Sequence, residues 1–425
     1  MHMKLFHFFT GIALVLSAMS VQAQTTLNTV PEGVINLSLP AASTTYLSVP
    51  LTADPSYRGH VSSSIAVTSN TIAVDDSPAP WTAGALANLY FVKFLSGNEM
   101  GRVVLITANT ANSLTLDTTD NNTGGTVSLT TTTPTAFNVQ AGDAFEVFPA
   151  DTLGSMFGEY TTQAGTWTGA TTAVTLSAPN SDIQVGATVS GIGIASGTTV
   201  SAISGTSLTL STPTTASGTG VTLSFSGSAQ LVLAGGTAYS NADIVNIYNP
   251  SLLKFQAYFF NTTTGCWVLK GSTVNANNTI LYPYGALAVF RRVTSALSFS
   301  ITGRVPEVPV LTKAGSATVA YGSSGYPVPL TLSQLDLGSN WLASSTYGGA
   351  DILSLYSPTL LKFVSYFQLP DSTSWRTKAS ATDVSETTTI DPGDVVVLFQ
   401  RGNVGGSASF LSPAMPYTID AYTIF

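Results

Sequence analysis

Residues 242–270 read ADIVNIYNPSLLKFQAYFFNTTTGCWVLK, and residues 350–378 read ADILSLYSPTLLKFVSYFQLPDSTSWRTK. In both segments, here called the first copy and the second copy, short runs of β-branched and aromatic residues alternate with turn residues, which predicts β-strands. The likeness resumes downstream at three pairs of equivalent residues: Pro283 and Pro392, Phe290 and Phe399, Arg292 and Arg401. Each copy therefore predicts a four-stranded antiparallel meander. Sandwich packing of the two is favoured, because two copies cannot close a propeller ring.

The rest of the sequence also has residue patterns that are typical of β-strands. Short runs of this kind occupy 46–51, 103–106, 114–117 and 144–148, with clusters of Gly, Asn, Pro and Asp between strands. No segment has the period of a long amphipathic helix. The sequence therefore predicts an all-β chain of several antiparallel sandwich-like or barrel-like domains, with a duplicated four-stranded meander and little or no helix apart from a signal peptide.

The N-terminus has the features of a secretory signal peptide. Lys4 precedes an apolar run at 8–19, and Val-Gln-Ala at 21–23 resembles a signal peptidase site. The run is shorter than the roughly 20 residues of a membrane-spanning helix. We therefore expect export to the medium, the cell surface or the outer envelope, with no integral membrane span after cleavage. The expected domains are a signal peptide at 1–23, an N-terminal β domain at 24–159, an inserted β module at 160–228, the first repeat at 229–306 and the second repeat at 307–425.

Residues 160–228 differ from their neighbours in having almost no charge. The run at 185–200 reads VGATVSGIGIASGTTV, and SGTSLTL follows at 204–210. This segment resembles a small β module that recurs in bacterial surface proteins and phage tail-associated proteins. The resemblance implies an inserted β module and says little about activity.

A second resemblance covers most of the rest of the chain. It is carried by SVPL at 48–51, SGNEMGR at 96–102, TANTANSLTLD at 107–117, AGD at 141–143 and the two copies. These features resemble an uncharacterised family of secreted bacterial proteins. The resemblance implies secretion, and it brings no catalytic residues, because no activity is established for that family.

Charge and cysteine content exclude several classes of protein. Only 8% of the residues are charged, and 22 Asp and Glu outnumber 14 Lys and Arg, whereas about 25% charged residues is usual. We expect no nucleic-acid partner, because phosphate binding needs clustered Lys and Arg. The single cysteine, Cys266, excludes an intramolecular disulfide, and its place beside Trp267 favours a buried apolar role.

Few residues combine into catalytic sets. His60 is the only histidine beyond the signal peptide and is expected in a turn, so His-rich zinc sites are excluded. Two carboxylate pairs, Asp143 with Glu146 and Asp391 with Asp394, have the residue types that glycoside hydrolysis requires. Their positions beside Gly at strand entrances favour turn capping instead. We therefore expect no catalytic residue and no cofactor.

Two further features were weighed as binding sites. The loop that contains Asp117, Asp120 and Asn122 offers oxygen ligands for calcium. It lacks the glycine and the terminal glutamate of an EF-hand, so a hairpin turn is favoured and no metal site is predicted. Arg102 opens a strand after a turn, where its guanidinium could bind a carboxylate or sugar hydroxyls, although fixing the loop is the favoured interpretation.

Trp267 and Trp375 occupy the same place in the two copies. Strand alternation puts Trp267 and Leu269 on one face, with Val268 and Lys270 on the other. We expect the lysine face to meet solvent and both indoles to face the core. The alternative is a pair of exposed platforms that stack on sugar rings.

Three functions therefore remain open. The leading hypothesis is a noncatalytic secreted or cell-surface protein with a structural or adhesive role. The first alternative is an extracellular carbohydrate-binding protein, and the second is a polysaccharide-acting hydrolase that uses the carboxylate pairs. The expected partners are extracellular glycans or other cell-surface proteins.

Overall fold

The computed structural model describes residues 31–119, 128–130, 138–158, 160–180, 183, 185–226, 233–249, 252, 254–314, 319–338, 340–401, 409–411 and 414–417. Strands account for 42% and helix for 4%, in several antiparallel sheets that include a half-barrel and a nearly closed barrel. The predicted all-β fold class is confirmed. No helix within these ranges is long and apolar enough to cross a membrane. The expected signal peptide lies outside the described residues.

The first copy forms a five-stranded antiparallel sheet in the order β18-β17-β16-β20-β2. Its strands are β16 (Ile244–Asn249), β17 (Lys254–Asn261), β18 (Cys266–Leu269), β20 (Ala286–Phe290) and β2 (Thr44–Ser48). Within this copy, β16 pairs with β17 and β17 pairs with β18, as predicted. The fourth, β20, pairs with β16 rather than with β18. This is Greek-key order, which arises because the long connection between β18 and β20 carries the chain to the other side of β16.

The second copy has the same order, β27-β26-β25-β29-β23. Its strands are β25 (Ile352–Ser357), β26 (Lys362–Gln368), β27 (Trp375–Thr377), β29 (Val396–Phe399) and β23 (Val319–Gly322). The register of the edge strands also corresponds, because Tyr46 of β2 lies opposite Ala288 and Tyr321 of β23 lies opposite Val397.

The correspondence extends to elements outside the two sheets. Each copy has a two-stranded ribbon, a short strand pair, a helical turn after that pair, and a 3-10 turn before its central strand. In the first copy these are β1 (Glu32–Leu39) with β21 (Leu297–Arg304), β9 (Asp151–Thr152) with β19 (Ile280–Leu281), α1 (Leu153–Phe157) and η1 (Tyr239–Asn241). In the second copy they are β22 (Thr312–Ala314) with β30 (Ser409–Leu411), β24 (Leu330–Thr331) with β28 (Thr389–Ile390), η2 (Leu332–Gln334) and η3 (Tyr347–Gly349).

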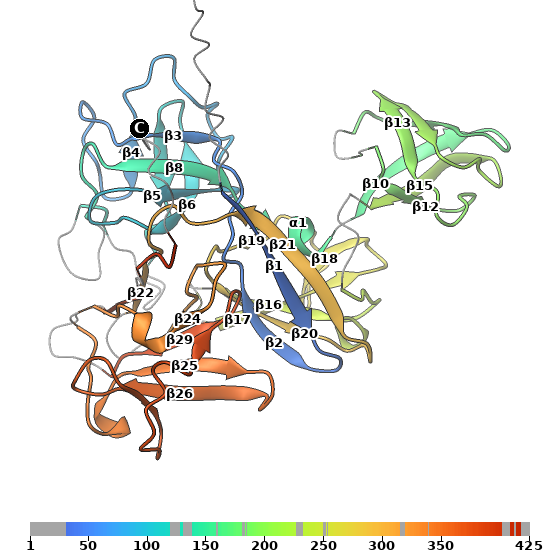
Figure 1. Ribbon diagram of the computed structural model, residues 1–425. Helices are drawn as coiled ribbons and strands as arrows, with labels where there is room; N and C mark the ends of the chain where they lie inside the picture. Colours follow the sequence, from blue (N-terminus) through green and yellow to red (C-terminus); the bar gives the residue numbers. More distant parts are fainter. Residues whose placement is uncertain are drawn as a thin grey trace, which may run out of the picture. The chain divides into compact units, whose positions relative to one another are not determined.

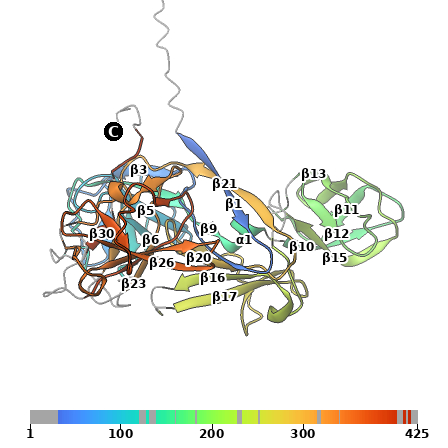
Figure 2. The ribbon, with the colours of Figure 1, turned by 60° about the horizontal axis from the view of Figure 1, so that its bottom comes forward.

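The first copy is interrupted twice along the chain. Residues 49–150 separate β2 from β9, and residues 158–238 separate α1 from η1, whereas short segments join the equivalent elements of the second copy. The expected N-terminal domain at 24–159 therefore differs from the observed pairing. Figure 1 and Figure 2 both show β1 of that range alongside β21 of the first copy. Pairing between distant segments leaves no trace in local periodicity, so the sequence pattern could not place this boundary.

The first interruption forms a six-stranded antiparallel arrangement in the order β3-β8-β5-β6-β7-β4. The strands are β3 (Tyr57–His60), β8 (Ala144–Pro149), β5 (Tyr90–Phe94), β6 (Val103–Asn109), β7 (Ser113–Leu116) and β4 (Thr71–Ala73). The Ser62 amide, just after β3, donates to the Ala73 carbonyl of β4 at 2.7 Å. The two ends of the strand order are thereby joined, which reduces the number of open edges.

The second interruption contains the insert, with the order β12-β15-β10-β11-β14-β13. The strands are β10 (Tyr160–Trp167), β11 (Ala173–Leu176), β12 (Thr188–Ser190), β13 (Val200–Ser204), β14 (Ser207–Leu210) and β15 (Gly218–Ser226). A bridge between Thr188 and Thr199 links its two end strands. The buried core of the insert comes entirely from its own residues, Trp167 through Phe225. The insert thus has a hydrophobic core of its own within the described residues.

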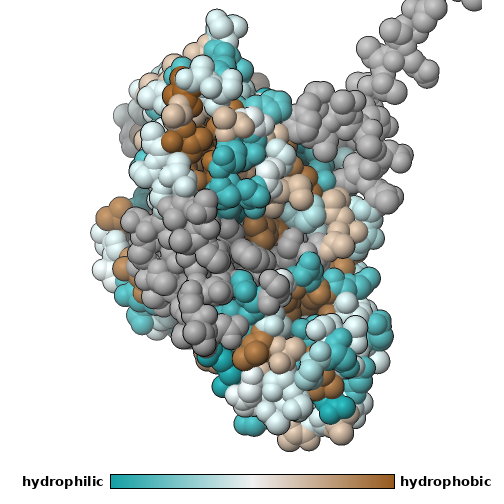
Figure 3. Space-filling model, turned by 90° about the vertical axis from the view of Figure 1, so that its left-hand side faces the viewer, coloured by the Kyte–Doolittle hydropathy of each residue, from teal (hydrophilic) through white to brown (hydrophobic). Residues whose placement is uncertain are grey.

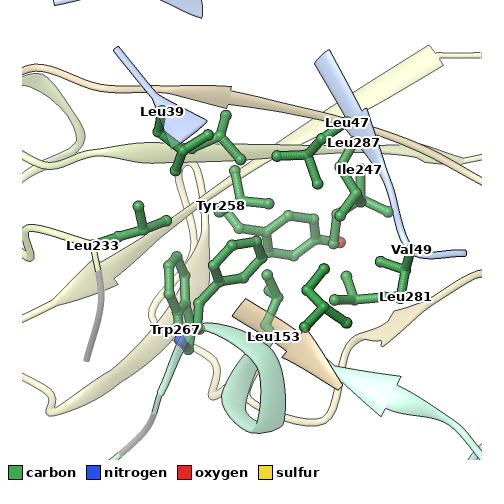
Figure 4. Packing of buried hydrophobic residues seen from close by; sticks show 14 of the residues in the cluster. Leu39, Leu47, Val49, Leu153, Leu233, Ile247, Tyr258, Trp267, Leu281 and Leu287 are labelled. Carbon is green, nitrogen blue, oxygen red and sulfur yellow. The ribbon is translucent and has the colours of Figure 1, made fainter. Parts of the chain in front are cut away.

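The core of the first copy draws on segments far apart in the chain. Leu39 and Leu47 precede the first interruption, Leu153 lies between the two, and Tyr258 and Trp267 follow the second. Figure 4 shows these side chains converging on one apolar centre. Each fully buried large apolar side chain contributes roughly 1.5–3 kcal/mol. Both interruptions are therefore bridged by the same packed core.

Aromatic rings connect the two copies reciprocally. Tyr46 of the first copy lies 4.9 Å from Tyr356 and 4.8 Å from Phe363, measured between ring centroids. The equivalent Tyr321 of the second copy contacts Tyr248 at 4.8 Å and Phe255 at 5.4 Å. Equivalent residues thus make equivalent contacts in both directions, as in a two-fold interface between identical subunits.

Candidate functional site

Both tryptophans that the sequence singled out are fully buried, at 0% exposure. Trp267 Nε1 donates to the Gly158 carbonyl at 2.8 Å, and the ring of Trp375 lies 6.4 Å from that of Trp341. The expectation that both indoles face the core is confirmed, and neither presents an open face to a sugar ring. The expectation for Val268 was wrong, because it is also 0% exposed and packs with Phe259 in a second apolar cluster.

Arg102 is engaged within its own loop. Its Nη1 donates to Glu99 Oε2 at 3.1 Å, and the other oxygen of Glu99 accepts the Asn138 amide at 2.9 Å. The arginine side chain is 15% exposed. This agrees with the favoured interpretation, in which Arg102 fixes the loop.

Of the three calcium candidates, the structure describes only Asp117. Asp117 Oδ1 accepts the Thr119 amide at 2.9 Å, a turn-type contact. Asp120 and Asn122 lie outside the described residues. Within the described ranges, no group of three or more His, Cys, Asp or Glu side chains could hold a metal ion.

Three of the four paired carboxylates lie in two turns of the same kind. Asp143 Oδ2 accepts the Gln140 amide at 2.8 Å, and Asp394 Oδ2 accepts the Asp391 amide at 2.9 Å. A glycine at positive φ precedes each capping aspartate, Gly142 at 86° and Gly393 at 88°. Burial is the main cause that raises the pKa of Asp394 to about 6. The capping interpretation fits both turns.

His60 and Cys266 complete the set of residues named from the sequence. His60 is the last residue of β3, so the turn expected there is wrong; the alternating exposure of β3 shows an ordinary strand. Cys266 is 7% exposed, and its thiol donates to the Thr264 hydroxyl at 3.3 Å. The cysteine therefore behaves as a small buried residue.

Glu146 belongs instead to a row of charges across three adjacent strands. Arg58 of β3 and Lys93 of β5 lie directly opposite Glu146 of β8 on its two sides. Side chains paired in this way on antiparallel strands point to the same face and lie about 4.5–5.5 Å apart at Cβ. Glu146 is 4% exposed and Lys93 is 2% exposed, so this part of the row is removed from water.

Arg304, at the end of β21, completes an ion-pair ring with this row. Its Nη1 lies 3.2 Å from Glu146 Oε2, and its Nη2 donates to Glu307. Arg58 Nη2 in turn lies 3.0 Å from Glu146 and 2.9 Å from Glu307. Each arginine thus contacts both glutamates. The attraction within such a ring repays the desolvation cost of buried charges only where the geometry is good and the remaining donors are hydrogen-bonded.

Lys93 stands beside this ring as an additional cation. No hydrogen bond or ion pair joins its ammonium to any of the described residues, and its Nζ lies 5.9 Å from the ring centroid of Tyr284. Desolvation by burial lowers the pKa of Lys93 to about 8, with Arg304 and Arg58 acting in the same direction and Glu146 and Glu307 opposing them. A buried ammonium without an acceptor is costly.

Tyr284 has two unusual features of its own. It is 5% exposed, and its hydroxyl has no hydrogen-bond partner among the described residues. Its φ is +61°, a backbone conformation that bulky side chains rarely adopt. In the second copy the equivalent position is Gly393, which adopts positive φ without strain.

Sequence reasoning singled out Glu146 but missed Lys93, Tyr284 and Arg304. The sequence did contain a sign of Lys93, because this lysine interrupts the apolar run YFVKF of β5. A lysine inside a buried strand is rare and marks a buried charge. Nothing in the sequence brings Arg304 to Glu146. Comparison of the chain with protein-family models, curated proteins and solved structures gave no match.

Proposed function

We propose that this chain is a noncatalytic structural or adhesive protein of the bacterial cell exterior, akin to the secreted family that its sequence resembles. The observation that carries the proposal is the use of the candidate catalytic and binding groups within the fold. Asp143 and Asp394 cap turns, Glu146 is held by two arginines, and Trp267 and Trp375 fill cores. A hydrolytic carboxylate pair needs both groups open to one substrate.

The surface is consistent with a scaffold that meets water mainly through uncharged polar groups. Only 8% of the residues are charged. On the face drawn in Figure 3, pale and hydrophilic residues surround separate small groups of apolar ones. Small, separate apolar groups such as those on this face are normal for a protein surface.

The burial of both tryptophans bears on the carbohydrate-binding alternative. Stacking on a sugar ring requires an accessible aromatic face, and both indoles are 0% exposed. No described observation favours sugar binding over a structural role, so it is not proposed.

Fractionation of cells that express the full chain tests the proposal. We expect the protein in the exported fractions, with a mature N-terminus at Gln24. A matched variant, Leu14→Arg with Leu16→Arg, interrupts the apolar run and should keep the chain in the cytoplasm. Uncleaved wild-type protein that remains in the cytoplasm, as the variant does, would contradict the proposal.

A further inference from the structure

We propose that the Lys93 ammonium and the Tyr284 hydroxyl form a binding site for a small monovalent anion of the carboxylate class. This inference is independent of the proposed structural role. The site has no counterpart in the second copy, in which Gly393 stands where Tyr284 stands in the first.

The first argument is the charge balance of the cluster. Three cations, Arg58, Lys93 and Arg304, face two carboxylates, Glu146 and Glu307. The charges of the two arginines and the two glutamates balance one another in the ion-pair ring, so we assign the excess positive charge to Lys93. Asp54 lies 3.7 Å from Arg304 Nε but is 70% exposed, so solvent screens its charge.

The second argument is that two buried side chains with donor groups lie beside each other, with Lys93 Nζ 5.9 Å from the ring centroid of Tyr284. Lys93 is 2% exposed and Tyr284 is 5% exposed, and neither polar group has a partner among the described residues. Leaving such groups unpaired costs about 1–3 kcal/mol each, and more for a charge. Tyr284 also retains a strained backbone at φ +61°. Strain of this kind persists where the surrounding structure holds it, often at ligand sites.

The third argument selects the class of ligand. One negative charge neutralises the excess of one positive charge, whereas a divalent anion would leave a net negative charge in a buried place. A carboxylate has two oxygens, which can accept from the ammonium and from the hydroxyl at the same time. A single-atom anion such as chloride offers no second acceptor atom directed at the hydroxyl.

Lys93 must be protonated to hold the anion, and the groups that face it set the range of pH. They are Glu146 of β8, Arg58 of β3, Arg304 of β21, Glu307 after β21, and Tyr284 before β20. Burial raises the pKa of Tyr284 well above its usual value, so its hydroxyl stays protonated. Binding should therefore be present below pH 8 and fade as the pH rises through about 8, the pKa of Lys93.

Thermal unfolding of the full chain in sodium formate, with sodium chloride at equal ionic strength as the second arm, tests the site. Below pH 8, we expect formate to raise the midpoint of the wild type saturably, by about 3 °C. The shift should be absent from Lys93→Met, which removes an unpaired charge and is expected to fold. Lys270→Met is the matched control, because Lys270 also lies over a tyrosine ring, at 4.4 Å from the centroid, but is exposed; it should keep the formate shift.

Tyr284→Phe provides the second variant. It removes a hydroxyl that has no partner, so folding should be unaffected, while the half-saturating formate concentration should rise about tenfold. A formate shift that is equal in wild type and Lys93→Met would overturn the proposal. So would the absence of any shift in the wild type, or a chloride shift as large as the formate shift.

Discussion

The first and second copies share a strand order, but their polar side-chain contacts differ at equivalent positions. Trp267 satisfies its indole nitrogen with the Gly158 carbonyl at 2.8 Å. The indole nitrogen of the equivalent Trp375 has no hydrogen-bond partner among the described residues, and the ring packs instead beside Trp341. The comparison indicates that apolar filling at this place is common to both copies, whereas the hydrogen bond is a local addition of the first.

A buried aspartate gives the same lesson. Asp243 and Asp351 each accept two backbone amides, one from the segment before the 3-10 turn and one after the last strand of the sheet. Asp243 also forms an ion pair with Arg291, whose Nε lies 3.1 Å from its Oδ2. Gln400 occupies the Arg291 position in the second copy, where the charge of Arg401 partly opposes the burial that raises the pKa of Asp351. In both copies the aspartate therefore joins two chain segments through backbone hydrogen bonds. The ion pair with arginine is found at this position in the first copy and is not shared.

The largest expected effect comes from removing either tryptophan. Trp267→Ala and Trp375→Ala should each lower the free energy of unfolding by about 3–5 kcal/mol, because each empties a fully buried site. Equilibrium urea unfolding measures both. Losses within about 0.5 kcal/mol, as at exposed sites, would refute the core role in that copy.

Replacing the equivalent aspartates by asparagine should cost the first copy more stability than the second. Asp243→Asn should cost about 3–5 kcal/mol, because Arg291, with a side chain 5% exposed, loses the one carboxylate that it contacts in the described part of the chain. Asp351→Asn should cost only about 1–3 kcal/mol, the loss of a buried amide acceptor. Combining Asp243→Asn with Arg291→Gln leaves no unpaired arginine at this place and should recover part of the difference in urea unfolding. Equal costs for the two single variants would show that the ion pair contributes nothing.

Asp394 gives the second copy a pH dependence that the first lacks, because Gly285 is its equivalent. Its pKa is raised from 3.8 to about 6 in the folded chain, so its contribution to stability is complete below pH 3.8 and is lost as the pH rises through about 6. Asp394→Asn should remove a change of about 1–3 kcal/mol across this window. Urea midpoints at several pH values measure the effect. An unchanged pH profile in the variant would be the contrary result.

The smallest difference concerns the indole hydrogen bond. Trp267→Phe loses the bond to Gly158, and Trp375→Phe loses none. The first substitution should therefore cost about 1 kcal/mol more than the second in the same urea experiment. Equal costs would mean that the bond adds no stability.

Much of the fold could be predicted, because strands and turns are encoded in local periodicity. The equivalence of Trp267 and Trp375, for example, followed from sequence and fits their shared burial. The face assignment of Val268 failed because the sheet is covered on both sides there, which alternation alone cannot reveal. The pairing of β1 and β2 with the first copy also escaped prediction, since more than 200 residues separate the partners.

The candidate site was less predictable for the same reason. Glu146 was noticed as a carboxylate, but its neighbours come from β3, β5 and the end of β21. Arg58 and Lys93 lie beside Glu146 because of the cross-strand register, and Arg304 lies there because β21 ends next to β8. The unusual backbone of Tyr284 could be inferred from sequence only by aligning Tyr284 with Gly393, which occupies a turn position that requires positive φ.

Hydrogen exchange at β20 tests most directly whether the first copy is one fold interrupted twice. The experiment compares the full chain with a chain that lacks residues 31–48 and therefore β1 and β2. If β2 completes the sheet, the amides of Ala286–Phe290 that pair with Thr44–Ser48 should lose their protection in the shortened chain, while β25 of the second copy stays protected. Full protection of β20 without β2 would contradict the interrupted fold and restore the N-terminal boundary that the sequence suggested.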